Sequence, residues 1–237
     1  MSPVNCIVPA RMGSSRFPGK PLIKIGGKEM IVRTLERAFL AECFERIVCA
    51  TDSEQIAEVV SNAGFEFVLT GPAATGSDRV AEAARMLDLD LVVNLQGDEP
   101  LVEPSVLVNV AKDLAAHPDC WVTVACPLKR EDVSAKTVVK VLVKDGLAVD
   151  FTRELSMEEA PRWFQHQGIY AYSRQSRDEF SSLPQNAVEL DRSLEQMRIL
   201  GRTPIRIVQS PFPSISVDVP SDASAVEALI HERKSLR

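Results

Sequence analysis

The regular alternation of short apolar runs with amphipathic segments constrains the fold more than any other feature of the sequence. In the first half of the 237-residue chain, apolar runs of strand length occupy residues 4–9, 46–50, 65–69 and 90–95. Segments with apolar side chains at helical spacing follow them, at residues 29–41, 52–63, 77–87 and 104–115. Continuous apolar strands that alternate with helices are typical of a parallel sheet with helices on both faces.

Capping residues support these helix boundaries. Asp52 or Ser53 is placed to cap the second helix, and Gly64 is placed to end it. Ser77 or Asp78 is expected to cap the third helix.

The second half of the chain has a different pattern. Strand-like runs occur at residues 121–126, 138–143, 147–151 and 168–173, and Lys144-Asp145-Gly146 is typical of a hairpin turn. A helix is predicted at 189–201, strands at 205–209 and 214–217, and a last helix at 221–234. These runs indicate antiparallel or mixed strands. Because no linker separates the halves, we expect one α/β domain over residues 1–237.

Composition excludes several classes of protein. With 45% apolar and 25% charged residues the chain is that of a globular protein, and no apolar stretch approaches the ~20 residues that span a bilayer. The net charge of −6 argues against nucleic-acid binding. The five cysteines form no C-x-x-C pair, so reduced thiols and a cytoplasmic location are expected. The three histidines lack metal-ligand spacing.

A basic loop follows the first predicted strand. Residues 1–28 hold five cations and no Asp or Glu, and three of the cations, Arg11, Arg16 and Lys20, lie within ten residues. Gly13 and Gly19 allow close backbone approach, so the loop suits a polyphosphate at the carboxyl edge of the sheet. Pro21 stands where a Walker A loop needs Ser or Thr. The alternative is a solvated basic loop with no ligand.

Two aspartates also follow predicted strands. Asp98 comes directly after the fourth strand, and Asp218 lies between the strand 214–217 and the last helix. Two carboxylates with phosphate oxygens and water make a suitable site for Mg²⁺. The alternative for each is a turn or helix-capping residue.

Several motifs resemble one enzyme family. They are PARMGSSRFPGKPL, ATDSEQIAEVV, TGSDRVAEAA and VVNLQGDEPLV, followed by VVKVL, FTR, HQGIYAY, LEQMRIL and SVDVPSD. The chain resembles the 3-deoxy-manno-octulosonate (Kdo) cytidylyltransferases, or CMP-Kdo synthetases, almost continuously over residues 3–110 and in segments beyond. The resemblance implies a Rossmann-like, mostly parallel mixed sheet of the nucleotide-diphospho-sugar transferase type. It also implies a nucleotide-binding half at about 1–115, a β-rich sugar-side and dimerisation region at about 116–203, and closing elements at 204–237.

The resemblance implies roles for particular residues. Those assigned to catalysis are Arg11, Lys20 and Asp98, and those assigned to Mg²⁺ are Asp98 and Asp218. The residues assigned to the nucleotide are Ala10, Arg11, Gly13, Ser14, Arg16, Lys20, Thr75, Gly76, Ser77, Arg79 and Gln96. The residues assigned to the sugar are Gln96, Arg153, His166, Tyr170, Glu195 and Gln196.

The implied reaction joins CTP to a 3-deoxy keto-acid sugar for lipopolysaccharide biosynthesis, in a homodimer that inserts into no membrane. The sequence departs from the family pattern only on the sugar side, at Asp150, at residues 154–157 and at Gln165. Cytidylyl transfer is therefore better supported than Kdo itself, and the acceptor could instead be a modified relative of Kdo. Two rival hypotheses are a nucleotidyltransferase for another sugar and a degenerate, non-catalytic homologue.

Overall fold

The computed structural model describes residues 2–13, 17–213 and 215–235. The chain forms two compact units, each built from separate segments. The N-terminal unit comprises residues 4–88, 94–108 and 214–237, and the middle unit comprises residues 1–3, 89–93 and 109–213. Strand β6 (Leu91–Leu95) and helix α4 (Pro104–Ala116) contribute residues to both units.

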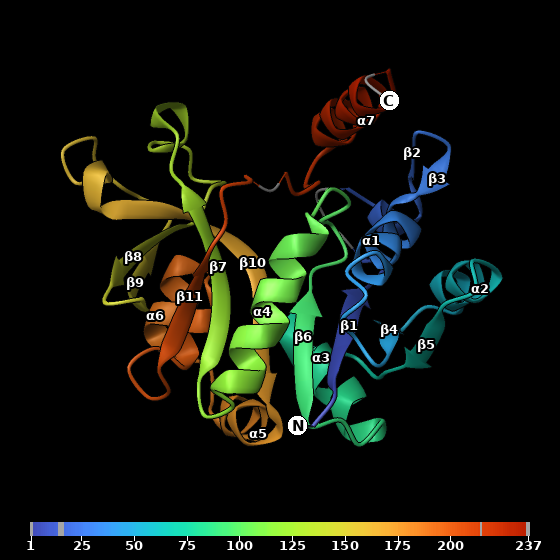
Figure 1. The fold of residues 1–237 in the computed structure, drawn as a ribbon, viewed down its shortest axis with the longest axis horizontal. Coiled ribbons are helices and arrows are strands. Elements are labelled where there is room, and N and C mark those ends of the chain that lie inside the picture. Colours follow the sequence, from blue (N-terminus) through green and yellow to red (C-terminus); the bar gives the residue numbers. More distant parts are fainter. Residues whose placement is uncertain (1, 14–16, 214, 236–237) are drawn as a thin grey trace. The chain divides into compact units, whose positions relative to one another are not determined.

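The N-terminal unit contains the predicted parallel strands. β5 (Glu66–Leu69), β4 (Ile47–Thr51) and β1 (Val4–Ala10) pair in that order, all parallel, and every residue of β1 is buried. Helices α1 (Met30–Phe39), α2 (Glu54–Asn62) and α3 (Gly76–Met86) pack against these strands (Figure 1). The apolar runs and helical spacings in the sequence predicted these elements, within a few residues at each end.

Short elements follow the basic loop. A 3₁₀ turn η1 (Lys20–Leu22) is followed by a small hairpin of β2 (Lys24–Ile25) and β3 (Lys28–Glu29). Gly19 precedes η1 with a φ of 70°, a left-handed conformation that favours glycine. The sequence pattern did not predict these elements, because two-residue strands carry no periodicity.

The caps of two helices differ in how well they were predicted. Ser53 caps α2, and Gly64 follows that helix with a φ of 82°, as expected. The prediction for α3 was wrong, because its N-cap is Thr75 and the helix begins at Gly76. Asp78 is the third helical residue, and its carboxylate accepts from the Thr75 amide while the Thr75 hydroxyl accepts from the Asp78 amide. This reciprocal capping box places the N-cap two or three residues earlier than predicted.

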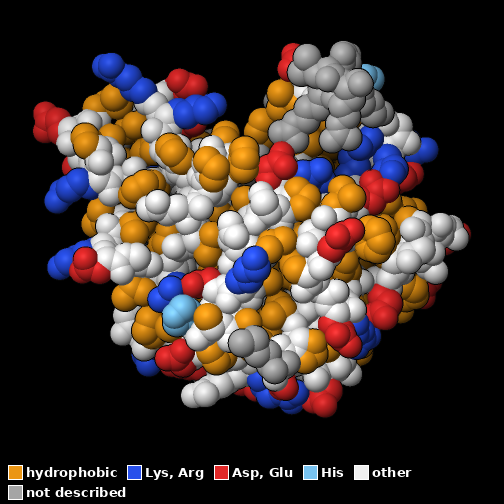
Figure 2. Space-filling view, in the orientation of Figure 1, with side chains coloured by type: hydrophobic (Ala, Val, Ile, Leu, Met, Phe, Trp, Pro, Cys, Tyr) orange, Lys and Arg blue, Asp and Glu red, His pale blue; other side chains and the backbone are white. Residues whose placement is uncertain are grey.

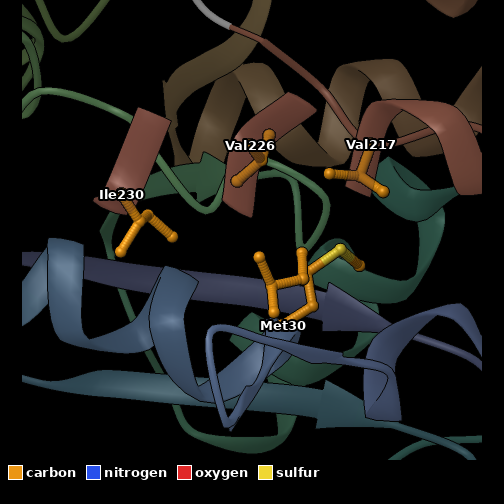
Figure 3. Close-up of a cluster of buried hydrophobic side chains, with 5 residues drawn as sticks. Met30, Val217, Val226 and Ile230 are labelled. Carbon is orange, nitrogen blue, oxygen red and sulfur yellow. The ribbon is translucent and has the colours of Figure 1, made fainter. Parts of the chain in front are cut away.

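The last helix is anchored by an apolar cluster of the N-terminal unit. α7 (Pro220–Ser235) contributes Val226 and Ile230, which lie opposite Met30 together with Val217 (Figure 3). Residues 215–217 form no strand, contrary to the prediction for 214–217. Instead the Val217 amide donates to the Asp98 carbonyl at 2.9 Å, which joins this segment to the loop after β6.

The middle unit is dominated by antiparallel pairing. Its strands are β7 (Trp121–Pro127), β8 (Lys140–Lys144), β9 (Leu147–Thr152), β10 (Trp163–Ser173) and β11 (Ile205–Gln209). They are ordered β10-β7-β11-β9-β8, β10 also pairs with β8, and only β11 and β7 are parallel. The predicted hairpin joins β8 to β9, with positive φ at Asp145 and Gly146. Two 3₁₀ turns, η2 (Arg130–Asp132) and η3 (Ala160–Arg162), lie between strands.

The helical part of the middle unit differs from the prediction. α5 (Arg174–Ser182) was not predicted. The single helix expected at 189–201 is instead α6 (Ala187–Arg192) and a 3₁₀ turn η4 (Glu195–Arg198), separated at Ser193 with a φ of 51°. The break folds η4 back on α6, so that the Arg198 guanidinium donates to the buried Glu189 carboxylate at 2.6 and 2.8 Å. A buried ion pair this well bonded outweighs a few residues of helix propensity.

Two expectations from composition, on the cysteines and on membrane-spanning segments, can be compared with the described residues. All five cysteines are free thiols, as predicted. Within the described ranges, no helix has both the length and the apolar character needed to cross a bilayer.

Candidate active site

A cleft of about 260 Å³ lies in the N-terminal unit, at the carboxyl ends of β1 and β6. All of its lining residues belong to this unit. The predicted site residues that line it are Ala10, Arg11, Lys20, Thr75, Gly76, Arg79, Gln96, Asp98 and Asp218. The structure therefore brings together residues from four segments that are distant in the sequence.

Lys20 forms the electrostatic centre of this cleft. Its Nζ lies 2.7 Å from Asp98 Oδ2 and 3.5 Å from Asp218 Oδ1. The hydrogen bond between Val217 and the Asp98 carbonyl holds the two carboxylate-bearing segments together. Asp218 is positioned further by Asp222, whose carboxylate accepts from the Asp218 amide at 2.8 Å. Two acidic side chains that are 120 residues apart thus share one ammonium group.

Glu99 is a buried carboxyl group that the sequence analysis did not single out. It is 5% exposed, and burial raises its pKa well above the usual range, with the Asp98 and Asp218 carboxylates acting in the same direction and Lys20 opposing them. Its position directly after Asp98 in Gly97-Asp98-Glu99-Pro100 is the only sequence signal that marks it.

The start of α3 forms another wall. Thr75 and Gly76 line the cleft, where the amides of the first helical turn carry partial positive charge that favours an anion. A Cβ on Gly76 would lie 3.1 Å from Gln96 Oε1, so the glycine permits close contact between these two residues. The side chain of Gln96 donates to Asn94, which in turn donates to Ser77. Ser77 is buried and does not line the cleft.

Arg79 is held rigidly at the same edge of the sheet. Its guanidinium is buried, donates to Asp52 Oδ2 at 2.6 Å and to the Thr70 hydroxyl, and contacts the Gly71 carbonyl. These partners follow β4 and β5, so Arg79 joins the carboxyl ends of two strands. The structure gives Arg79 a scaffold role beside the cleft as well as a place in its lining.

The remaining nucleotide residues are placed differently. Gly13 is exposed and does not line the cleft, and a Cβ there would meet no atom within 4 Å. Ser14 and Arg16 lie outside the described residues. Five lining residues were not predicted, and they are Pro9, Pro21, Met30, Ala73 and Gly97. Of these, Gly97 is constrained most, because a Cβ there would lie 2.7 Å from the Pro9 carbonyl oxygen.

Five of the six residues assigned to the sugar lie in the middle unit, and the sixth, Gln96, lines the cleft of the N-terminal unit. His166 Nε2 contacts the Thr123 hydroxyl at 2.9 Å, and the rings of His166 and Tyr170 are 5.6 Å apart. The Tyr170 hydroxyl donates to Gln196 Oε1 at 3.1 Å. Burial lowers the pKa of His166 to about 3, and the nearby Arg153 charge contributes to the same shift. Glu195 precedes Gln196 in η4.

The backbone around Arg153 is held by a buried lysine. Lys140 Nζ donates to the carbonyls of Ala135 and Arg153, while the Arg153 guanidinium donates to the carbonyls of Lys136 and Thr137. Burial lowers the pKa of Lys140. Thr123 and Lys140 are the two polar residues of this region that the sequence analysis missed, because an isolated Thr or Lys in a strand carries no motif.

The positions that depart from the family pattern have partners of their own. Asp150 accepts from Arg192 at 2.6 Å, and Arg192 also donates to the Phe151 carbonyl. Glu154 forms an exposed ion pair with Lys136. Gln165 lies in β10 opposite Cys126 and Lys140.

The residues present suit a magnesium ion. Among the described residues, no group of three or more metal-ligating side chains is close enough to hold a metal by itself. Asp98 and Asp218, however, converge on one cationic group from two separate segments. Two carboxylates fit Mg²⁺ when phosphate and water supply its other oxygen ligands.

Comparison with known proteins identifies the family. The cytidylyltransferase family profile matches residues 5–204. A protein of Anaeromyxobacter sp. (strain K) named 3-deoxy-manno-octulosonate cytidylyltransferase is 40% identical over 97% of this chain and 98% of its own length. The chain belongs to the cytidylyltransferase family. Another family member of the same name, from Syntrophobacter fumaroxidans, is 41% identical over 93% of this chain and 94% of its own length.

Solved structures agree with this assignment. A CMP:2-keto-3-deoxy-manno-octonic acid synthetase complexed with CTP superposes with a TM-score of 0.91 and 31% identity, over 98% of this chain and all of the other. A glucose-1-phosphate thymidylyltransferase from Bacillus anthracis has a TM-score of 0.70 at 13% identity, covering 95% of this chain and 94% of its own. This cytidylyltransferase therefore has the α/β fold of nucleotide-sugar transferases, as the resemblance in its motifs implied.

Proposed function

We propose that the protein transfers a cytidylyl group from CTP to the 3-deoxy keto-acid sugar Kdo, giving CMP-Kdo and pyrophosphate for lipopolysaccharide biosynthesis in the cytoplasm. The observation that carries this proposal is the convergence of Lys20, Asp98 and Asp218 in a cleft that Arg11 also lines. Full-length similarity to enzymes named for this reaction supports the choice of nucleotide and sugar.

The cationic and amide groups of the cleft suit a triphosphate. Lys20 and Arg11 supply positive charge, and the first turn of α3, which also lines the cleft, supplies backbone amides. Asp98 and Asp218 would hold Mg²⁺, which when bound offsets the negative charge of the triphosphate and lowers the pKa of a coordinated hydroxyl. In the proposed reaction a bond forms between the anomeric oxygen of the sugar and the α-phosphorus. The bond from that phosphorus to the pyrophosphate oxygen breaks, and the hydroxyl proton leaves to water.

Catalysis in this scheme depends on positioning and charge rather than on a covalent intermediate. The segments that carry Lys20, Asp98 and Asp218 are fixed to one another by the Val217–Asp98 hydrogen bond and by the cluster around Met30. Charged groups that are already oriented stabilise a transition state without reorganisation at the moment of reaction. The residues proposed to bind the sugar are Gln96, Arg153, His166, Tyr170, Glu195 and Gln196.

A pyrophosphate-release assay tests the proposal. Each of the four nucleoside triphosphates is combined with Kdo and with amino-substituted 3-deoxy sugar acids, with and without Mg²⁺. We expect the highest kcat/KM for CTP with Kdo, and release only when Mg²⁺ is present. Preference for UTP or GTP with a sugar phosphate would indicate another nucleotidyltransferase. Absence of turnover with every pair would indicate a non-catalytic homologue, and preference for a substituted sugar would identify a modified acceptor.

We further propose that two chains associate through the middle unit. Large hydrophobic side chains with exposures between 44% and 60% occur there at Val149, Met157, Val188, Leu190 and Phe212. Figure 2 shows hydrophobic side chains on the surface of this unit among Lys, Arg, Asp and Glu. The N-terminal unit also exposes large hydrophobic side chains, so the choice of the middle unit rests on the resemblance to a family in which the β-rich region pairs two chains.

A further inference from the structure

A β-bulge in β10 brings two of the sugar-side residues together. His166 lies opposite Ala125 of β7 and Gln167 opposite Val124, but the next pair in register is Tyr170 with Thr123. Residues 168 and 169 are therefore extra residues in β10. As a result His166 and Tyr170, which are four residues apart, face partners only two apart, and their ring centroids are 5.6 Å from each other.

The hydroxyl of Thr123 lies close to the backbone of this bulge and has one proton to donate. Its Oγ1 is 2.7 Å from the Ile169 carbonyl oxygen and 3.4 Å from the Gln167 carbonyl oxygen. Carbonyl oxygens only accept hydrogen bonds, so the hydroxyl proton is directed to Ile169. The same Oγ1 is 2.9 Å from His166 Nε2. A proton for that second hydrogen bond must therefore come from the imidazole, which places a hydrogen on Nε2.

In this protonation state Nδ1, the second ring nitrogen of His166, carries no hydrogen. The imidazole is buried, and burial together with the nearby Arg153 charge keeps its pKa at about 3, so the ring is neutral near pH 7. A neutral imidazole carries one N–H, and here it is on Nε2. No described residue bonds to Nδ1 of His166, which is therefore available as an acceptor.

Gln196 carries a hydrogen-bond donor that complements the acceptor on His166. Tyr170 donates its hydroxyl proton to Gln196 Oε1, while Gln196 Nε2 is buried without a hydrogen-bond partner among the described residues. Among the described residues, the cluster thus contains one acceptor without a partner, His166 Nδ1, and one buried donor without a partner, Gln196 Nε2. A sugar hydroxyl both donates and accepts, so it can satisfy these atoms, whereas a carboxylate oxygen can only accept.

We propose that Thr123 is a positioning residue that fixes His166 as the Nε2–H tautomer, so that His166 accepts a hydrogen bond from a hydroxyl of the sugar acid and does not donate one to its carboxylate. The sugar part of this inference rests on the proposed function. The tautomer part concerns the protein alone and can be tested without substrate.

The first experiment measures the ring nitrogens of His166 by ¹⁵N NMR on the substrate-free protein. The chain has only three histidines, and a His166→Asn variant assigns the signal. We expect a protonated Nε2 and a bare Nδ1 that stay unchanged between pH 8 and pH 5. A protonated Nδ1, or a ring that takes up a proton in this range, would overturn the proposal.

The second experiment separates a positioning role from a structural one. Thr123→Val keeps the branched shape but removes the hydroxyl, and Thr123→Ser keeps the hydroxyl. We expect Thr123→Val to change the His166 spectrum and raise KM for Kdo roughly tenfold with KM for CTP unchanged, and Thr123→Ser to behave like the natural protein.

A matched control is available in the same unit. Thr203→Val removes a hydroxyl that donates to Glu179, which is not a member of the cluster, and should leave both KM values unchanged. An unchanged KM for Kdo in Thr123→Val, despite an altered spectrum, would overturn the role in sugar binding. Absence of turnover with any sugar acid would instead contradict the proposed function, and the spectrum would still decide the tautomer.

Discussion

At the scale of single residues, we propose two roles for Lys20, one in the free protein and one with a triphosphate bound. In the free protein its ammonium group offsets the repulsion between Asp98 and Asp218, which both lie within 3.5 Å of it. With a triphosphate in the cleft, the same group is close enough to the carboxylates to bind phosphate oxygens beside them. Lys20 would therefore hold the two carboxylates in place in the free protein and bind the negative charge of the proposed substrate.

Replacing Lys20 with Ala removes this charge. We expect kcat/KM for CTP to fall roughly 30- to 150-fold, since a charge-assisted hydrogen bond contributes about 2–3 kcal/mol. Steady-state pyrophosphate release measures the change. Lys24→Ala is the matched control, because Lys24 is 66% exposed and forms only a 3.6 Å surface pair with Glu29. Equal kinetics of the two variants would contradict the role of Lys20.

Asp98→Asn tests the proposed metal ligand. The amide has nearly the same shape but no negative charge, so we expect turnover to be lost while the unfolding transition stays close to that of the natural protein. Asp88→Asn is the control, because Asp88 is exposed and its φ of 53° is one that Asn adopts readily. Near-normal pyrophosphate release by Asp98→Asn would exclude Asp98 from the site.

The lowered pKa of His166 predicts that the stability of the protein depends on pH. Its pKa falls from 6.5 in the unfolded chain to about 3 in the folded protein, so the unfolded state binds a proton first as the pH falls. Its contribution to stability is complete above pH 6.5 and is lost progressively towards pH 3. Between pH 6.5 and 5 the free energy of unfolding should fall by up to about 2 kcal/mol from this residue.

Urea unfolding at several pH values measures that contribution. A His166→Asn variant should lose less stability than the natural protein over this range, whereas His231→Asn, at an exposed position of α7, should behave like the natural protein. Identical pH dependence in all three proteins would show that His166 titrates in the folded state as it does in the unfolded chain.

At the scale of elements, the N-terminus of α3 contributes both to the stability of the fold and to the wall of the cleft. The capping box of Thr75 and Asp78 fixes the first turn, and Thr75 and Gly76 line the cleft. Because the first amides of the helix have no partners within the helix, the cap determines where they point. A change at Thr75 should therefore affect both folding and nucleotide binding.

Thr75→Ala removes the cap. We expect a loss of about 1 kcal/mol in the free energy of unfolding and a higher KM for CTP, while Thr75→Ser should restore both. Ser53→Ala is the comparison at α2, where Ser53 accepts from the Ile56 amide and does not line the cleft. It should lose stability and keep its KM. A raised KM in Ser53→Ala would show that general destabilisation, rather than the α3 terminus, alters nucleotide binding.

At the scale of the whole molecule, the proposed homodimer predicts a mass. Light scattering should give about twice the 26.1 kDa of one chain. Leu190→Lys, at a side chain that is 60% exposed, should shift the mass towards one chain, because it places a charge on the proposed surface. Phe39→Lys, at a side chain of similar exposure in the N-terminal unit, is the control. A mass near 26.1 kDa for the natural protein would refute the dimer.

The sequence by itself determined the main strands and helices of the N-terminal unit, the basic loop and the two aspartates, but it missed η1, β2 and β3 and wrongly predicted a strand at 214–217. These are local properties: an apolar run predicts a buried strand, and a loop or carboxylate directly after it must lie at that strand's carboxyl end. The motifs also indicated the family, because they are contiguous stretches of sequence.

Only the tertiary structure decided which of these residues meet and how they are oriented. The sharing of Lys20 by two carboxylates, the burial of Arg79 against Asp52 and the contact of Thr123 with His166 all join segments distant in the chain. The two extra residues of the β10 bulge determine the last contact, and the Glu189–Arg198 pair overrides an otherwise continuous helix. Periodicity reports only which face a residue occupies, whereas a hydrogen bond depends on the register between strands and on the path of the backbone.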